Sequence, residues 1–358
     1  MTIDSFVFGG LPARVVFGQG SIGSVPDEAT RLGIRRALVI SSEDKAQLAL
    51  SVVSALGRRA ARSFTRASGR SPHDSAERAI AIARANGIDG VVSIGNGATV
   101  GVGKAVALRL GIRHLAVPTT YAGAEATPFL DPERETLGGV RAARRARPDT
   151  LVYDPAQTRD LSPELAAASG LTAIAHAVEG LYAPDGNPLV ELMAEEAIRS
   201  LAAALPAIAA DPADDAARAL ALRGGWLAGN VLAGATMGLH HDLVILVSAA
   251  HDLPYGATSA ALLPHVAAFN REAAAGPLER VAAALGAQDP VAGLASLCDR
   301  VGAPTSLASI GFARGAIVGI VDRLLANPPP NPRALDRASV ADLLARALEG
   351  PPATGETV

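Results

Sequence analysis

The chain has 358 residues, 49% hydrophobic and 19% charged, so it can bury a sizeable core and divide into two domains. A formal net charge of −3 and an aromatic content of 3% argue against nucleic-acid binding, which needs a basic surface. The amino-terminal residues lack the pattern of a secretory signal, and the apolar stretches are too short to span a bilayer. We therefore expect a cytoplasmic protein without a membrane partner.

The first part of the chain alternates short apolar runs with segments of helical spacing. "RVVFG" and "ALVISS" are typical of strands, and the segment between them has helical spacing with Pro26 near its start. Strands that alternate with helices predict a parallel sheet, and hence an α/β domain over residues 1–157. The pattern continues as helix, strand, helix and strand over residues 71–87, 89–95, 101–111 and 114–120.

The character of the sequence changes after "DTLVYDP" at residues 149–155. The remainder is rich in alanine and leucine at helical spacing, and it begins with Ser162 as a natural N-cap and Pro163 in the first helical position. We predict an all-α domain over residues 158–350. The tail over residues 351–358 has no apolar periodicity and is expected to be disordered.

A glycine-rich turn joins a predicted strand to a predicted helix. The turn contains Gly95, Asn96, Gly97 and Ala98. Small residues let a backbone approach a pyrophosphate, and the free amides at a helix start attract its charge. The same turn occurs in proteins that bind no nucleotide, so on this motif alone the two interpretations are about equal.

Four further segments carry a resemblance to a known family. They are "AVPTTYAGAEATP" at residues 116–128, "DTLVYDP", "SGLTAIAHAVEGLYAPDGNP" at residues 169–188, and "MGLHH" at residues 237–241. Together they resemble the iron-containing alcohol dehydrogenase superfamily, and within it the maleylacetate reductases. The segment "NPPPNPRAL" at residues 327–335 is similar to the ending of that subfamily.

The resemblance implies the dehydroquinate synthase-like fold of that superfamily. It implies a dinucleotide-binding α/β domain, a helical domain, an active site in the cleft between them, and a homodimer acting on a small-molecule substrate. The cofactor would be NADH or NADPH. Its expected contacts are Gly95, Asn96, Gly97 and Ala98 for the pyrophosphate, Thr119, Thr120 and Tyr121 in a second segment, and Ser41 and Ser42 near the ribose.

The metal positions implied by the resemblance depart from the family pattern. One aspartate and three histidines are expected, and this chain has Thr172, His176, Ile245 and Tyr255 there. A single imidazole among these side chains is a poor ligand set for iron or zinc. We therefore predict no bound catalytic metal, with Thr172, Ile245 and Tyr255 lining the substrate site instead.

The candidate catalytic residues are His240, Tyr255, His176, His241 and His251. For His240 a role in the cleft is favoured over that of a hydrogen-bonded structural histidine, because imidazole chemistry suits proton transfer near neutral pH. For His241 and Tyr255 the two interpretations are about equal. For His251 a ring bonded to a backbone carbonyl is at least as plausible as catalysis. Residues expected to hold a dicarboxylate are replaced, as by Ser259, so maleylacetate is a doubtful substrate.

Three functional hypotheses follow. The first is a metal-independent reductase that transfers a hydride from NADH or NADPH to a carbonyl or activated alkene. The second is a non-redox enzyme of specialised biosynthesis on the same fold, such as a cyclase, dehydratase or lyase, because fold does not fix function. The third is a catalytically inactive partner protein. Glu43, Asp44 and Lys45 mix charges after the second strand, with the acidic pair slightly favouring NADH.

Overall fold

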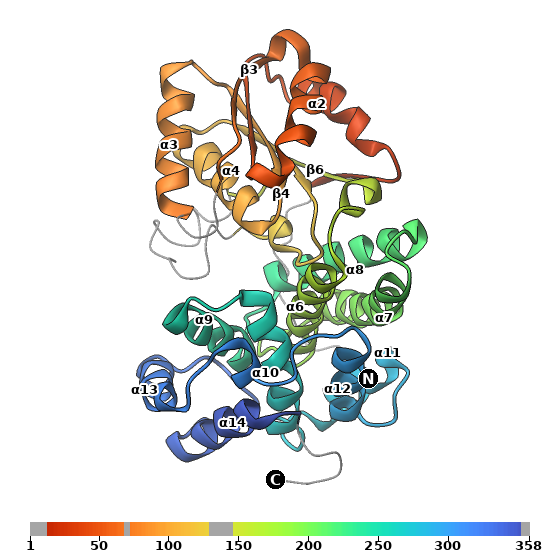
Figure 1. The fold of residues 1–358 in the computed structure, drawn as a ribbon, viewed down its shortest axis with the longest axis vertical. Helices are drawn as coiled ribbons and strands as arrows, with labels where there is room; N and C mark the ends of the chain where they lie inside the picture. The colour runs from red at the N-terminus through yellow and green to blue at the C-terminus, as the bar shows by residue number, and fades with distance from the viewer. Residues whose placement is uncertain (1–12, 68–71, 129–145, 352–358) are drawn as a thin grey trace. The chain divides into compact units, whose positions relative to one another are not determined.

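The computed structural model describes residues 13–67, 72–128 and 146–351. These residues form two compact units, which divide between Leu161 and Ser162 (Figure 1). The first is an α/β unit with a parallel sheet and the second is helical, so the predicted fold class is confirmed. The predicted tail falls almost entirely on residues 352–358, which lie outside the described residues.

The division after Leu161 lies at the end of the region, residues 155–161, where the change in sequence predicts the boundary, and four residues after residue 157. A single-turn helix, η5 (Pro155–Thr158), belongs to the α/β unit because Tyr121 donates a hydrogen bond to Thr158. Asp160 accepts a hydrogen bond from Lys45 of the same unit. These contacts join residues that are far apart in the chain, so a local sequence pattern does not predict them.

Six strands form the sheet of the α/β unit in the order β1-β6-β5-β4-β2-β3, and every neighbouring pair is parallel. β2 and β4 are buried along their whole length, as expected for strands covered on both faces. The strands are β1 (Arg14–Phe17), β2 (Ala37–Ser41), β3 (Ala60–Phe64), β4 (Gly90–Gly95), β5 (Arg113–Pro118) and β6 (Thr150–Tyr153).

Helices cover both faces of this sheet (Figure 1). Alternate residues of each central strand point to opposite faces, so that Val39 packs with one helix pair and Leu38 with the other. The first pair is α1 (Val25–Arg31) with α2 (Ala46–Leu56), and the second is α3 (Pro72–Ala85) with α4 (Gly97–Leu110). The sequence analysis did not identify α2 or β3. Strand β3 lacks an apolar pattern because it is a short strand at the edge of the sheet, with mostly exposed or half-buried residues.

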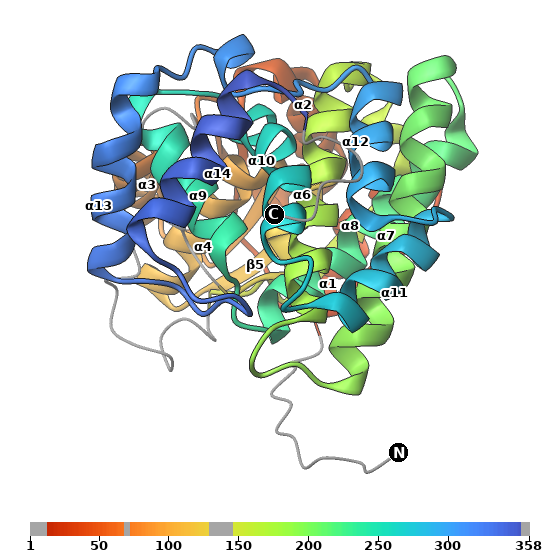
Figure 2. The same cartoon turned by 90° about the horizontal axis from the view of Figure 1, so that it is seen from below.

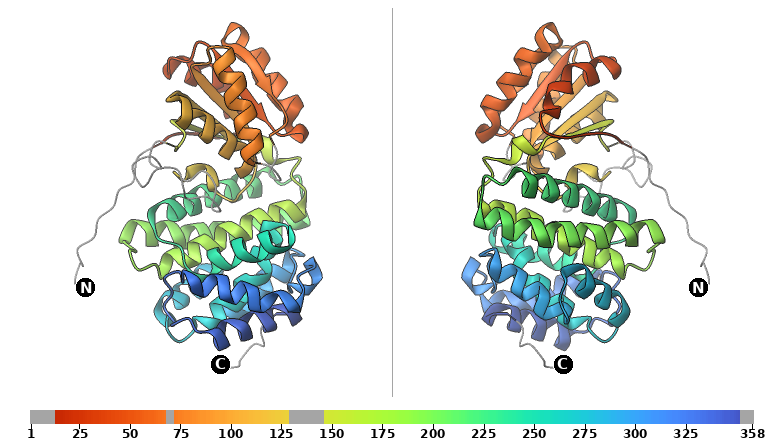
Figure 3. Two further views of the ribbon diagram at one scale, coloured as in Figure 1. Left: turned by 90° about the vertical axis from the view of Figure 1, so that its left-hand side faces the viewer. Right: turned by 90° about the vertical axis from the view of Figure 1, so that its right-hand side faces the viewer.

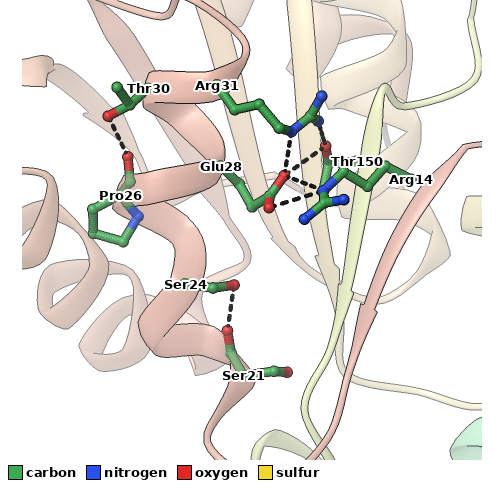
Figure 4. A network of polar contacts seen from close by, with 8 residues as sticks. All are labelled: Arg14, Ser21, Ser24, Pro26, Glu28, Thr30, Arg31 and Thr150. Atoms are coloured by element: carbon green, nitrogen blue, oxygen red, sulfur yellow. Dashed lines mark hydrogen bonds and ion pairs between the residues drawn. The ribbon is translucent and has the colours of Figure 1, made fainter.

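A buried carboxylate fastens helix α1 to the open edge of the sheet, as Figure 4 shows. Glu28 binds Arg14 of β1 at 2.9 Å and Arg31 of its own helix at 2.7 Å. Arg31 also donates to the hydroxyl of Thr150 on β6 at 2.5 Å. The two arginines hold the pKa of Glu28 below its usual range although burial opposes this. The network joins α1 to β1 and β6, the two strands at this edge of the sheet.

The helical unit packs in two groups of helices (Figures 2 and 3). Three long helices lie side by side, and a second group shares a core that includes Leu239, Leu262, Ile320 and Leu344. The long helices are α6 (Pro163–Leu181), α7 (Pro188–Ala210) and α8 (Asp215–Gly234). The core is formed mainly by α9 (Leu239–His251), α10 (Tyr255–Phe269), α13 (Ile317–Ala326) and α14 (Arg337–Glu349), whereas α11 (Ala275–Leu285) packs against α7 and α12 (Pro290–Arg300) packs against α10.

The starts of these helices follow from local sequence. Ser162 caps α6 by accepting the N–H of Leu165, with proline in the first turn, as predicted. Asn187 accepts two amides at the start of α7. Because such caps depend on neighbouring residues alone, they are visible in the sequence.

One stretch, Ala275–Arg300, has the length and hydropathy of a possible membrane span. In the structure it is two helices of 11 residues each, α11 and α12, separated at Gly286, whose φ of 67° ends the first. A spanning helix needs about 20 continuous residues. The pair α8 and α9 passes the same test only across a bend of 100°. These helices are weak evidence for a membrane span.

Candidate active site

The loops at the carboxyl edge of the sheet bring together the segments expected to bind the cofactor. From β2 the chain crosses outward to β3 and then returns to β4, on the other side of β2. The strand order therefore reverses between β2 and β4, and ligands of such sheets bind at this switch point. Ser41 and Ser42 follow β2, and the glycine-rich turn follows β4.

The glycine-rich turn has the backbone of an anion site. Gly95 has a φ of 147°, and a Cβ there would lie 2.9 Å from the Thr99 hydroxyl. Asn96 caps α4 by accepting the N–H of Thr99 at 3.1 Å, so asparagine replaces the family's glycine without losing the turn. Among the described residues, no protein acceptor meets the amides of Gly97 and Ala98 at this helix start. The residues present fit a pyrophosphate.

The segment after β5 lies against this turn. The N–H of Thr119 donates to the carbonyl of Gly95 at 3.0 Å. The hydroxyls of Thr119 and Ser41 are both buried and have no partner in the part of the chain that the structure describes, and Thr120 is half-buried. Tyr121 differs from its neighbours because its side chain is fully buried and its hydroxyl donates to Thr158 at 3.1 Å. Only the backbone of Tyr121 is therefore available to a nucleotide.

In the helical unit, a buried carboxylate that the sequence analysis did not single out organises the start of α9. Glu179 of α6 accepts the backbone N–H groups of Gly238 at 3.0 Å, His240 at 2.7 Å and His241 at 3.2 Å. Burial raises the pKa of Glu179 to about 7, although the three amides favour its charged form. The available signal was an acidic residue three positions after His176 in an otherwise apolar helix.

Only glycine fits at Gly238. A Cβ there would lie 2.9 Å from the carbonyl oxygen of Pro330 and 3.0 Å from Glu179 Oε1. The glycine of "MGLHH" therefore lets the chain pass close enough to Glu179 for its amides to be accepted.

Three histidines, which we call the histidine cluster, lie at this helix start: His176, His240 and His241. The rings of His176 and His241 meet edge to face with centroids 5.6 Å apart. Burial lowers the pKa of His240 and of His241 to about 4 and that of His176 well below its usual value. All three are therefore neutral near pH 7.

The members of the cluster differ in their free nitrogens. His240 Nε2 lies 3.0 Å from the carbonyl oxygen of Ser259, and since a carbonyl can only accept, this nitrogen carries the proton. The Nδ1 atoms of His176 and His241 are buried without a partner among the described residues, as is the hydroxyl of Ser259. His240 Nε2 thus has a backbone partner, as in a hydrogen-bonded structural histidine, whereas the buried nitrogens without a partner in the described part of the cluster belong to His176 and His241.

The other predicted site residues of the helical unit differ in their burial and in their contacts. Tyr255 begins α10, is partly buried, and has its pKa raised by burial and by the charges of Glu179 and Asp242. Ile245 is half-buried on α9. Thr172 lies one turn before His176, but its hydroxyl donates to the carbonyl of Ala168 at 2.9 Å.

His251 does not join the cluster. It lies at the exposed end of α9, with its ring edge to face with Phe312 at 5.4 Å. Eleven residues of helix place it about 16 Å along the axis from His240. The cluster and His251 therefore cannot act on the same atom.

The residues present do not fit a catalytic metal. No group of three or more His, Cys, Asp or Glu side chains among the described residues is arranged to hold an ion, even though three histidines are neighbours. Both oxygens of Glu179 are occupied by amides, and His240 Nε2 is occupied by a carbonyl. A borderline cation prefers several converging imidazole or charged donors.

Two models of one protein family match most of the chain. Residues 12–155 match the family model described as iron-containing alcohol dehydrogenase, and residues 166–348 match that of the Fe-containing alcohol dehydrogenase family, C-terminal. A maleylacetate reductase of Sphingobium indicum is 44% identical over 98% of this chain and 99% of its own length. A maleylacetate reductase of Burkholderia cepacia is 42% identical over 97% of this chain and 99% of its own length.

Solved structures give the same result. The crystal structure of maleylacetate reductase from Agrobacterium tumefaciens matches with a TM-score of 0.91 and 40% identity, over 98% of this chain and all of that one. A 1,3-propanediol oxidoreductase, 23% identical with a TM-score of 0.87, shares the fold. The chain is thus an oxidoreductase of the nicotinamide-dependent class. It belongs to the iron-containing alcohol dehydrogenase family, and within it is most like the maleylacetate reductases.

Proposed function

We propose that this chain is a metal-independent reductase that uses NADH or NADPH to reduce a carbonyl or activated alkene of a small organic substrate. The observation that carries the proposal is the set of residues at the four positions where the family pattern expects an aspartate and three histidines, which in this chain are Thr172, His176, Ile245 and Tyr255. Maleylacetate, named for the relatives, is a doubtful substrate because Tyr255 and Ser259 replace expected histidines. A related small carbonyl compound is preferred.

The chain's own residues have separate tasks in this reaction. The amides of Gly97 and Ala98 and the hydroxyl of Thr119 bind the cofactor, which supplies a hydride when bound. His176 and His241, neutral near pH 7, hold the substrate oxygen by hydrogen bonds in place of a Lewis acid. As the oxygen gains charge, it takes a proton from an imidazole that receives one from solvent on its other nitrogen, or from the neutral phenol of Tyr255, which solvent then reprotonates.

The non-redox hypothesis receives no support from a particular observation. The glycine-rich turn keeps its geometry despite its altered residues, and nearly the whole chain aligns with reductases. We retain from the resemblance the expectations of a homodimer and of a cytoplasmic location. Light scattering of the purified protein tests the first, and fractionation of cells of its source tests the second.

The deciding experiment uses the full chain before and after exhaustive dialysis against a chelator. Titration calorimetry with NADH and with NADPH, followed by a screen of small 2-oxo and enol acids, should give micromolar cofactor binding and turnover. Both should stay within about twofold after chelation and after addition of Fe²⁺ or Zn²⁺. Turnover that disappears on chelation and returns with metal would refute metal independence. A folded sample that binds neither nucleotide would refute the reductase itself.

A further inference from the structure

A buried lysine in the α/β unit makes an unusual set of contacts. Lys104 lies in the middle of α4 with 2% of its surface exposed. Its ammonium group donates to the carbonyl of Ala124 at 2.7 Å, to the carbonyl of Thr127 at 2.8 Å and to the Thr127 hydroxyl at 3.1 Å. Every one of these acceptors lies in the segment that follows β5.

This segment, Thr119–Thr127, contacts the glycine-rich turn and helix α4 at three points. Its first residue donates to Gly95 of the glycine-rich turn at 3.0 Å. Farther on, Ala124 lies so close to Gly97 that a Cβ on the glycine would be 3.2 Å from that of Ala124. Lys104 supplies the last attachment, about two helical turns and 10 Å beyond Gly97 on α4. The segment therefore docks along the same helix whose start presents the pyrophosphate amides.

Simple stability does not account for an ammonium group in this place. The acceptors of its three hydrogen bonds to Ala124 and Thr127 are neutral, and burial lowers the pKa of Lys104 to about 7. The buried carboxylate of Glu125 compensates in part, and it accepts a hydrogen bond from the Tyr153 hydroxyl at 2.9 Å. Buried charges of this kind often cost more than apolar packing would, and in some proteins they fix a specific geometry. The geometry that Lys104 specifies is that of the segment.

We propose that Lys104 is a positioning residue for the nicotinamide cofactor. Its hydrogen bonds fix the Thr119–Thr127 segment against α4, and so set the distance between the Thr119 and Thr120 contacts and the amides of Gly97 and Ala98. The proposal rests on the proposed function, because it requires that the turn and the segment bind one nucleotide together. Lys104 touches neither substrate nor cofactor and acts through the segment.

The test compares Lys104→Met with Arg109→Met in the full-length protein. Arg109 is a cation on the same helix, α4, but it lies in the last turn and pairs with Glu77 of α3. The dissociation constant of the better-bound nucleotide should rise about tenfold or more in Lys104→Met and stay within about twofold in Arg109→Met. At saturating cofactor, kcat and the KM for the second substrate should change by less than about threefold. A merely structural role would not produce this split.

Two conservative variants keep the test decisive if Lys104→Met does not fold. Lys104→Arg retains the charge but cannot place three donors at one point, and Thr127→Val removes one acceptor. Each should weaken nucleotide binding by about threefold or more while circular dichroism and melting confirm folding. Folded variants with wild-type affinity would overturn the positioning role alone. Absence of nucleotide binding by the wild-type protein would overturn this role and the proposed function together.

Discussion

Glu179 Oε1 accepts the backbone N–H of His240 at 2.7 Å, although the two residues lie on different helices and 61 positions apart in the chain. With its other oxygen the same carboxylate accepts the amides of Gly238 and His241. An acidic group at a helix start satisfies amides that have no partner within the helix and complements the helix dipole. The orientation of the histidine cluster thus depends on Glu179.

Replacing this carboxylate tests that dependence. Glu179→Gln keeps the size of the side chain but turns one acceptor into a donor facing backbone N–H groups. We expect the free energy of unfolding to fall by about 1–3 kcal/mol and kcat to fall, with cofactor affinity unchanged. Urea unfolding and steady-state kinetics measure these quantities.

A matched control is Asp185→Asn. Asp185 accepts the N–H and the hydroxyl of Thr236 in the same stretch of chain, but it is exposed. Its loss should cost less than about 1 kcal/mol and leave kcat intact. Equal effects of the two substitutions would show that Glu179 has no special role in the cluster.

The two adjacent histidines should respond differently to substitution. His241→Asn removes the imidazole whose Nδ1 is unpaired, so kcat should fall by about 100-fold or more. In His240→Gln the new side chain can still donate a hydrogen bond to the Ser259 carbonyl, so kcat should fall by less than about threefold. In His240→Ala that hydrogen bond is absent, so kcat should fall further. Measurement of kcat at saturating cofactor distinguishes them. A larger loss in His240→Gln than in His241→Asn would make His240 the proton-handling residue.

Stability should decrease in mild acid because of the buried histidines. The pKa of His240 is about 4 in the folded protein and near 6.5 in an unfolded chain. Between these values the unfolded chain binds a proton that the folded chain does not, so the free energy of unfolding falls as the pH drops from 6.5 toward 4. The stability that neutral His240 contributes is fully present above pH 6.5.

This pH dependence is measured by denaturant unfolding at a series of pH values for the wild type and for His240→Gln. His241 and His265 have similarly lowered pKa values, so the wild-type curve alone does not isolate one residue. The difference between the two curves should grow as the pH falls through the window, on the order of 1–3 kcal/mol by pH 4. Parallel curves would mean that His240 titrates alike in both states.

We expect the charges after β2 to favour binding of NADH over NADPH. Glu43 and Asp44 are exposed, whereas Lys45 is buried and lies 2.6 Å from Asp160, so its charge is already paired. The remaining acidic pair would repel a 2′-phosphate on the ribose. The double variant Glu43→Gln with Asp44→Asn should narrow the preference for NADH by about fivefold at low salt, roughly 1 kcal/mol.

The control for this preference removes the ion pair without changing net charge. In Lys45→Met combined with Asp160→Asn, the ratio of the two dissociation constants should stay within about twofold of that of the wild type. Added salt should narrow the wild-type preference, since exposed charges are screened. A wild-type protein that binds both nucleotides equally at low salt contradicts the assignment.

Much of the molecule was determined by local sequence. The parallel sheet followed from strands that alternate with helices, and the start of α6 followed from Ser162 and Pro163. The turn at Gly95 and Asn96 was visible because a tight strand-to-helix connection restricts residue type. The strand β3 escaped because an exposed edge needs little apolar patterning.

Tertiary structure decided the polar contacts of the candidate site. His240 and His251 lie on one helix, and the local sequence does not distinguish their environments. In the structure His240 is buried against Ser259, whereas His251 is exposed. The hydrogen-bond partners of Glu179, Lys45 and Lys104 lie many residues away in the chain. Periodicity and capping record only near neighbours, because a residue's backbone preferences are local. Burial, pKa and hydrogen-bond partners depend on which distant elements pack together, and that is fixed only when the chain is folded.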